Sequence, residues 1–152
     1  MRASGMKALL LLETSMRLIL TALLFVAGLF FVFLGIGFLL TPASSAEDFG
    51  LATSGVEGLA TIRADMTAFF IVAGACMIWG AWRRKGDPLL ISAALFAIAF
   101  VGRAINAIAV EPYDGFWAPM LVEALAVALC LAAYRMLPHQ AFAGGLNRQL
   151  GR

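Results

Sequence analysis

Two polar residues, Arg103 and Asn106, interrupt an apolar stretch that extends from Pro88 to Val110. A guanidinium group at membrane depth needs a polar partner or water, because an isolated charge is costly in hydrocarbon. Two other apolar stretches each carry a carboxylate, Asp65 and Glu123. We expect both carboxylates to lie close to Arg103, and Asn106, three positions further along, to share its helix face.

Two kinds of role fit this cluster of four residues. Arg103 could bind an anionic head group and Glu123 could relay protons, as intramembrane ionisable groups do in transporters. Alternatively, the opposite charges form a structural ion pair that fixes how the helices are rotated, because pairing reduces the cost of burying either charge. The expected position of the cluster near the membrane surface favours the structural interpretation.

The composition indicates that membrane-spanning helices position these residues. The chain has 152 residues, of which 62% are hydrophobic and 13% are charged, and its mean hydropathy is +0.94. Soluble domains average about half apolar and about a quarter charged residues. A span needs roughly 20 apolar residues, so four spans with short connections account for the whole length. We therefore predict an all-α integral membrane protein, a four-helix bundle that forms a single transmembrane domain over residues 1–152.

Four apolar segments predict the spans, which cover approximately residues 18–40, 63–82, 88–109 and 120–137. The first is longer than the apolar core of a secretory signal, so we interpret it as a span. Thr41-Pro42 ends the first span, and Asp87-Pro88 supplies the N-cap and the first helical residue of the third. Tyr113 and Trp117 fit the aromatic belt at a membrane interface.

Residues 43–62 form the longest connection, which we expect to lie on the extracytoplasmic membrane surface and to cover one end of the bundle. Ser44 and Glu47 have the spacing of a capping box, which predicts a short interfacial helix that begins there. Three glycines follow and are expected to interrupt helical structure: Gly50, Gly55 and Gly58. A simple connector is favoured over a lid that covers a binding site.

Small residues recur at helical spacing on two predicted spans. On the first span they stand at heptad spacing, at Thr21, Gly28 and Gly35. On the fourth span they follow Glu123, at Ala126, Cys130 and Ala133. Small side chains let neighbouring helices approach closely in a membrane, so we interpret both stripes as packed helix faces rather than ligand grooves.

The charged residues predict the orientation of the four spans. Basic residues gather on one side of the layout, at Arg2, Lys7, Arg17, Arg83, Arg84, Lys85, Arg135, Arg148 and Arg152. The positive-inside rule therefore predicts that both termini are cytoplasmic. Arg103 then lies roughly 22 Å up a helix that rises from the cytoplasm, at about 1.5 Å per residue. Because the hydrocarbon layer is about 30 Å thick, the cluster is expected in the outer third of the membrane.

Residue types that build most catalytic and cofactor sites are scarce. Cys76 and Cys130 lie within apolar segments, where thiols are more often packing residues than redox groups. The single histidine, His139, lies outside the predicted spans, and no ligand spacing typical of metal or haem sites occurs. The net charge of +2 is too small and too scattered for nucleic-acid binding. We therefore expect no cofactor, no metal and no nucleic acid.

Several short motifs occur in an order and spacing similar to those of a known family. They are Gly35 with Leu39-Leu40-Thr41-Pro42, then Arg63-Ala64-Asp65, Gly102-Arg103, Asp114-Gly115 and Glu123. From about Met16 to Leu137 the chain resembles the bacterial four-span proteins of domain of unknown function 4345. The resemblance implies a small protein of the bacterial inner membrane with no assigned activity. Residues 1–15 precede the matching part and could contact a partner.

Three functions compete at this point. The favoured one is a non-enzymatic accessory subunit that packs against a larger membrane complex or against itself, because catalytic machinery is lacking and the first span is rich in phenylalanine. The alternative is a binder or carrier of a small amphiphile or lipid, at an outer-leaflet site around Arg103. A cavity that is open to the outer leaflet beside Arg103 would favour this alternative. A membrane enzyme with Glu123 as acid or base ranks last.

Overall fold

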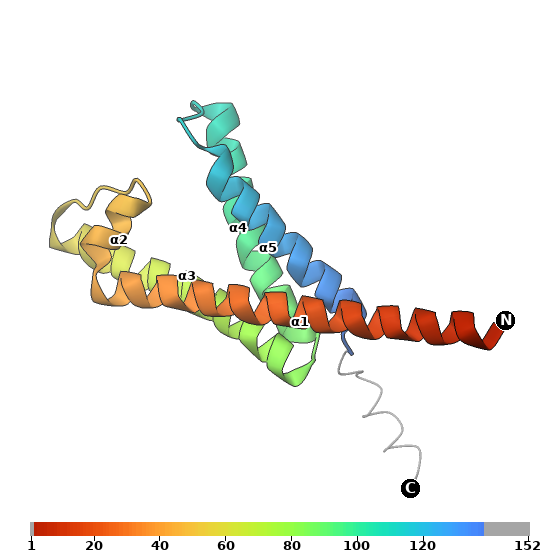
Figure 1. Ribbon diagram of the computed structural model, residues 1–152. Helices are drawn as coiled ribbons and strands as arrows, with labels where there is room; N and C mark the ends of the chain where they lie inside the picture. Colours follow the sequence, from red (N-terminus) through yellow and green to blue (C-terminus); the bar gives the residue numbers. More distant parts are fainter. Residues whose placement is uncertain (1, 139–152) are drawn as a thin grey trace, which may run out of the picture.

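The computed structural model describes residues 2–138, with side chains from residue 11 onward, and the predicted cytoplasmic tail 139–152 lies outside the described residues. Five helices and no strand occur in this part of the chain (Figure 1). They are α1 (Arg2–Leu40), α2 (Pro42–Asp48), α3 (Gly55–Arg83), α4 (Asp87–Ala109) and α5 (Trp117–Met136). The predicted all-α class is therefore confirmed.

Four of these helices are long and apolar enough to cross a membrane. The segments are Leu11–Leu40 within α1, and the whole of α3, α4 and α5. The number of spans predicted from hydropathy is thus confirmed. Two helices extend beyond the predicted bounds, since α1 reaches back to Arg2 and α3 begins at Gly55 rather than near Arg63. Apolar length sets the span, whereas a helix continues until its backbone is turned or capped.

The connection between α1 and α3 contains a short helix, as expected, but not at the predicted residue. Helix α2 begins at Pro42 with Thr41 as N-cap, and no side chain caps it. Ser44 and Glu47 lie inside α2, so the predicted capping box is wrong. Proline is favoured at a first helical position because its fixed φ suits the helix. It also lacks an N–H, and the N–H at that position would have no acceptor within the helix.

Of the three glycines expected to break helical structure in this connection, two have a left-handed backbone. Gly50 and Gly55 have φ of 69° and 64°. Gly58 instead lies within α3, so the expectation was wrong at that position. Glu57 in the first turn supports a helix here, because its carboxylate faces the positive end of the helix dipole.

Helices α1 and α3 share the largest interface, which the glycine stripe of α1 makes possible. A Cβ placed on Gly28 would lie 2.8 Å from the carbonyl oxygen of Gly74, and one on Gly35 would lie 2.6 Å from the Ile71 side chain. Both distances are shorter than real Cβ contacts, so the backbone of α3 excludes a side chain at Gly28, and the Ile71 side chain would have to move to admit one at Gly35. The interpretation of this stripe as a packed face is confirmed at Gly28 and Gly35, whereas Thr21 lines a pocket instead.

Helices α4 and α5 form a second pair, which joins α1 and α3 at one end only. The buried residues of α4 are Leu89, Ser92, Ala93 and Phe96, all in its first half. The hydroxyl of Ser92 donates a 2.7 Å hydrogen bond to the carbonyl oxygen of Ala73 on α3. Beyond Phe96 the two pairs diverge, and the α4–α5 pair stands away from α2 and the start of α3 (Figure 1).

An aromatic core fills the junction and the α1–α3 interface. Phe31 packs against Phe96 of α4 with ring centroids 4.5 Å apart and stacks on Phe70 of α3. Phe38 stacks on Phe70 in turn, and Phe49, directly after α2, packs edge-on against both rings. The connection between α1 and α3 therefore covers the end of that pair.

Candidate functional site

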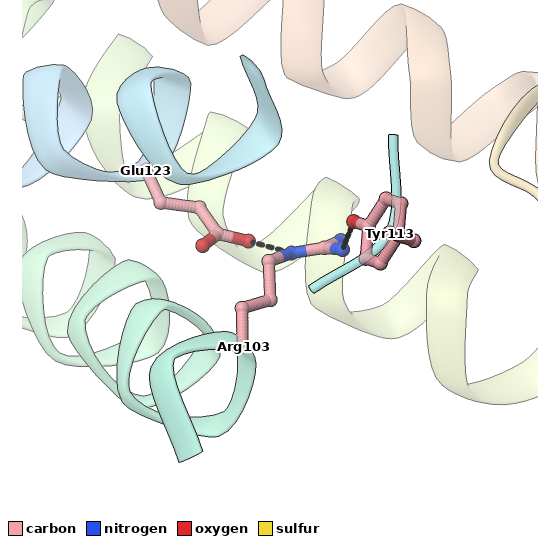
Figure 2. Close-up of polar contacts among 3 residues, drawn as sticks. All are labelled: Arg103, Tyr113 and Glu123. Atoms are coloured by element: carbon pink, nitrogen blue, oxygen red, sulfur yellow. Dashed lines mark hydrogen bonds and ion pairs between the residues drawn. The ribbon is translucent and has the colours of Figure 1, made fainter. Parts of the chain in front are cut away.

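Arg103 and Glu123 form an ion pair between α4 and α5. The Nε–H of Arg103 donates to Oε1 of Glu123 over 2.8 Å (Figure 2). Glu123 stands at the head of the small-residue stripe of α5, whose members Ala126, Cys130 and Ala133 are all buried. These small residues are buried in the helix packing, and the pairing of α5 with α4 brings the carboxylate within reach of the guanidinium.

Tyr113 adds a third polar side chain to the pair. Nη1 of Arg103 donates to the Tyr113 hydroxyl over 3.2 Å, so the guanidinium extends between the carboxylate and the phenol (Figure 2). The sequence pattern placed Tyr113 in the aromatic belt and did not predict this contact. The position of Tyr113 in the short α4–α5 connection, ten residues after Arg103, was a usable signal, because a chain that reverses there returns past the end of α4.

Asp65 does not join the cluster, and the expectation that it lies close to Arg103 is wrong. It is exposed on α3 and forms no hydrogen bond or ion pair with Arg103 in the described part of the chain. The packed face of α3 includes Phe70, Ala73 and Met77. Asp65 precedes Phe70 by five positions, and at 3.6 residues per turn it points about 140° away from that ring.

Burial differs sharply between the two charged partners. The Glu123 side chain is only 9% exposed, whereas that of Arg103 is 36% exposed. The second carboxylate oxygen of Glu123, Oε2, is buried and accepts no hydrogen bond within residues 2–138. Glu123 is thus the interior anchor of the pair, and Arg103 is the group that reaches the surface of the helix pair.

A pocket of about 320 Å³ opens beside the guanidinium. It is lined by Ala99, Gly102, Arg103, Asn106, Ala107, Tyr113, Phe116 and Met120. Asn106, predicted as a site residue, lies here and is exposed. A Cβ on Gly102 would meet nothing within 4 Å, so the pocket has free space beside that residue. The pocket therefore combines apolar walls with three polar side chains.

Hydrogen-bond donors dominate the polar lining of this pocket. A guanidinium carries five N–H groups, and the contacts to Glu123 and Tyr113 account for two of them. The Tyr113 hydroxyl accepts from Arg103, so its own hydrogen can still be donated, and the Asn106 amide adds two further donors. The arrangement suits a group rich in oxygen acceptors. No cluster of metal-ligating side chains occurs among the described residues, and Cys76 and Cys130 are free thiols.

Comparison with known proteins gives one result. A family model described as "Domain of unknown function (DUF4345)" matches residues 19–134, which include all of α2, α3 and α4 and the polar residues of the pocket. No curated protein and no solved structure matches the chain.

Proposed function

The chain belongs to the DUF4345 family, and we propose that it binds the polar head group of a membrane amphiphile in the pocket beside Arg103. The observation that carries this proposal is the convergence of Arg103, Asn106 and Tyr113 on one apolar-walled pocket at the end of α4. Small-molecule sites in proteins commonly combine apolar walls with a few such polar groups. The presence of a pocket beside Arg103 supports amphiphile binding over a purely structural ion pair, which needs no cavity.

The depth of the pocket supports an amphiphile as ligand. Arg103 lies roughly 9 Å along the helix from the end of α4 at Ala109, at about 1.5 Å rise per residue. A head group at this level contacts the guanidinium while its tail extends into hydrocarbon past Gly102 and Ala99. Donors without a partner are costly in hydrocarbon, so an acceptor-rich head group would stabilise Arg103. The ligand class is therefore an amphiphile with a carboxylate or phosphate.

Glu123 has a positioning role in this proposal. Its carboxylate holds the Nε edge of the guanidinium from the interior side and leaves the remaining Nη hydrogens directed elsewhere. The negative charge of Glu123 also neutralises the positive charge of Arg103. Ligand affinity therefore comes from hydrogen-bond geometry more than from net charge.

Binding can be tested with the full-length protein in nanodiscs and dibromostearate as probe. Replacing Trp79 and Trp82 by Phe leaves Trp117 as the single fluorophore, next to the pocket residue Phe116. Bromine quenches indole fluorescence at short range. We expect saturable quenching by the acid and much weaker quenching by its methyl ester. Equal, non-saturable quenching by both compounds would overturn the proposal.

Variants of the pocket make this test specific. Tyr113→Phe removes one donor and keeps the ring, and Asn106→Leu removes the amide at an exposed position. Each is expected to weaken binding by about threefold to tenfold, as for loss of one hydrogen bond. Arg63→Leu is the matched control, because Arg63 is an exposed arginine outside the pocket lining. Unchanged affinity in both pocket variants would contradict the assignment.

A second candidate function is that of an accessory subunit that packs with another membrane protein or with a second copy of this chain. It is favoured by the large apolar surface of α1, on which Phe30 and Phe33 are 53% and 74% exposed. Cross-linking in native membranes followed by mild-detergent purification tests it. A monodisperse monomer without a co-purifying protein would contradict this function and leave amphiphile binding standing.

The localisation that we propose follows from the charge distribution. The chain would reside in the inner membrane of a bacterium with both termini in the cytoplasm, because basic residues flank the same ends of the spans. Arg83 and Arg84 at the α3–α4 connection support this orientation, as do Arg17 on α1 and Arg135 in the last turn of α5. The pocket beside Arg103 would then face the outer leaflet.

A further inference from the structure

A second pocket, of about 440 Å³, lies at the other end of the protein from Arg103. Side chains of α1, the α3–α4 connection and the end of α5 line it: Glu13, Thr14, Arg17, Leu18, Thr21, Arg84, Leu137 and Pro138. We propose that this pocket binds the phosphodiester of a glycerophospholipid, with Arg17 and Arg84 as the phosphate ligands. This site is independent of the proposed function at Arg103, which uses none of the same residues.

The place of the pocket along the helices fits a phospholipid phosphate. The predicted span within α1 begins near Leu18, α3 ends at Arg83, and α5 ends at Met136. Three membrane-spanning segments thus begin or end at this level, where a bilayer changes from hydrocarbon to head groups. Basic pockets between spans at such an interface are suited to phosphate-bearing head groups.

The backbone of Arg84 provides a separate argument. Arg84 is the only residue other than glycine with positive φ among residues 2–138, at 51°. It terminates α3, where its N–H donates to the carbonyl oxygen of Ala81 and the N–H of Lys85 donates to that of Gly80. Glycine is the usual residue at a left-handed helix terminus, because a Cβ is unfavourable there. An arginine held in this conformation, with its side chain lining a pocket, indicates that the guanidinium has a use there.

The charges of the lining match a phosphodiester. Arg17 and Arg84 oppose a single carboxylate, Glu13, so the pocket carries one net positive charge against the single negative charge of the ligand. Neither arginine forms an ion pair within the described part of the chain. Both are exposed and can therefore turn toward a bound phosphate. Arginine is well suited to this role because its planar donors can bind two phosphate oxygens at once.

The other residues that line the pocket can contact the glycerol and acyl chains of such a lipid. Leu18, Leu137 and Pro138 offer an apolar surface for the glycerol and the start of the acyl chains. The Thr21 hydroxyl donates to the carbonyl oxygen of Arg17 in its own helix, over 2.7 Å, so it is already engaged. Specific binding of a phosphate-bearing lipid therefore depends on the two arginines.

The test uses native mass spectrometry of the full-length protein titrated with dioleoylphosphatidylglycerol or with dioleoylglycerol, which has the same chains and lacks the phosphate. We expect a saturable adduct with the phospholipid and none with dioleoylglycerol. Arg84→Gly should lower the occupancy of that adduct by about tenfold or more, as for loss of a charge-assisted hydrogen bond. The same variant should melt at an unchanged or higher temperature, because glycine relieves the left-handed backbone.

Two controls make the result decisive. Arg17→Gln should lower occupancy to a similar extent, whereas Arg135→Gln should not, because Arg135 is a basic residue at the same end of α5 that does not line the pocket. Full retention of the phospholipid by the Arg84 and Arg17 variants would overturn the proposal, and so would an equal loss in the Arg135 variant. Displacement of the lipid by millimolar inorganic phosphate would instead assign the pocket to the free ion and overturn the lipid assignment.

Discussion

Gly74 of α3 faces Gly28 of α1 so closely that a Cβ on Gly74 would lie 2.5 Å from the carbonyl oxygen of Gly28. The same Cβ would lie 2.8 Å from the backbone nitrogen of Val32, so its two nearest neighbours are backbone atoms, which cannot move aside as a flexible side chain could. The two helices can therefore keep this separation only with glycine at both positions. This contact fixes the α1–α3 pair from which the α4–α5 pair diverges.

Gly74→Ala is expected to destabilise the protein by about 1–3 kcal/mol, the usual cost of adding an atom to a packed interface. Thermal unfolding in detergent, followed by circular dichroism, measures this change. Gly102→Ala is the matched control, because Gly102 also lies within a helix and its added Cβ would meet nothing within 4 Å. Similar melting temperatures for both variants would contradict the close approach of α1 and α3.

Arg103→Leu is expected to lower the yield of folded protein more than Arg63→Leu does. Loss of Arg103 leaves the Glu123 carboxylate buried without its partner, and removing one member of a fully buried pair costs about 3–5 kcal/mol. The cost here is smaller, because the Arg103 side chain is 36% exposed. Fluorescence-detected size-exclusion chromatography measures both yields. Equal yields would show that Arg103 is not engaged with the interior, and Arg103→Leu combined with Glu123→Leu should recover part of the loss.

Ser92→Ala is expected to loosen the junction between the two helix pairs. The Ser92 hydroxyl bonds to the Ala73 carbonyl oxygen across α3 and α4, and such interhelical bonds are worth about 0.6 kcal/mol on average in membrane proteins. Reversible unfolding in mixed micelles has the precision to detect this. Thr61→Ala is the control, since the Thr61 hydroxyl bonds to Glu57 within its own helix. A larger effect at Thr61 than at Ser92 would refute the assignment.

The orientation can be checked with single cysteines in a background of Cys76→Ala and Cys130→Ala. Cysteines introduced at Thr53 and Asp114 should react with an impermeant maleimide in intact cells. A cysteine at Lys85 should react only after the membrane is broken, because the basic connection is expected in the cytoplasm. The reverse pattern would overturn the proposed orientation and leave the four-span fold unchanged.

Hydropathy was sufficient to predict the spans, because roughly 20 apolar residues in sequence leave few alternatives to a membrane helix. The glycine spacing on α1 also identified its packed face correctly, at Gly28 and Gly35. Helix ends were harder to predict. At α2, proline at the first position decided the start, whereas the predicted capping box formed no cap. Local polar spacing is a weak signal when a stronger backbone constraint lies two residues away.

The candidate site was predicted in part, and the missing part depends on helix rotation. Arg103 and Glu123 meet because α4 and α5 are adjacent in sequence and pair along their length. Asp65 was expected nearby because its depth was judged from sequence position alone. The face of a helix that is buried depends on its partner, and α3 pairs mainly with α1. Tyr113 was missed because a tyrosine near a membrane interface usually needs no further explanation.

Because the two helix pairs diverge, the protein is wider at one end of its membrane-spanning helices than at the other. The α1–α3 and α4–α5 pairs meet near the α3–α4 connection and spread apart toward α2 and the α4–α5 connection (Figure 1). A wedge of this kind displaces more lipid from one leaflet than from the other. A bilayer bent so that its convex side meets the broad end accommodates the wedge with less elastic stress. We therefore expect the protein to partition into small, highly curved vesicles in preference to flat membranes when its broad end faces outward.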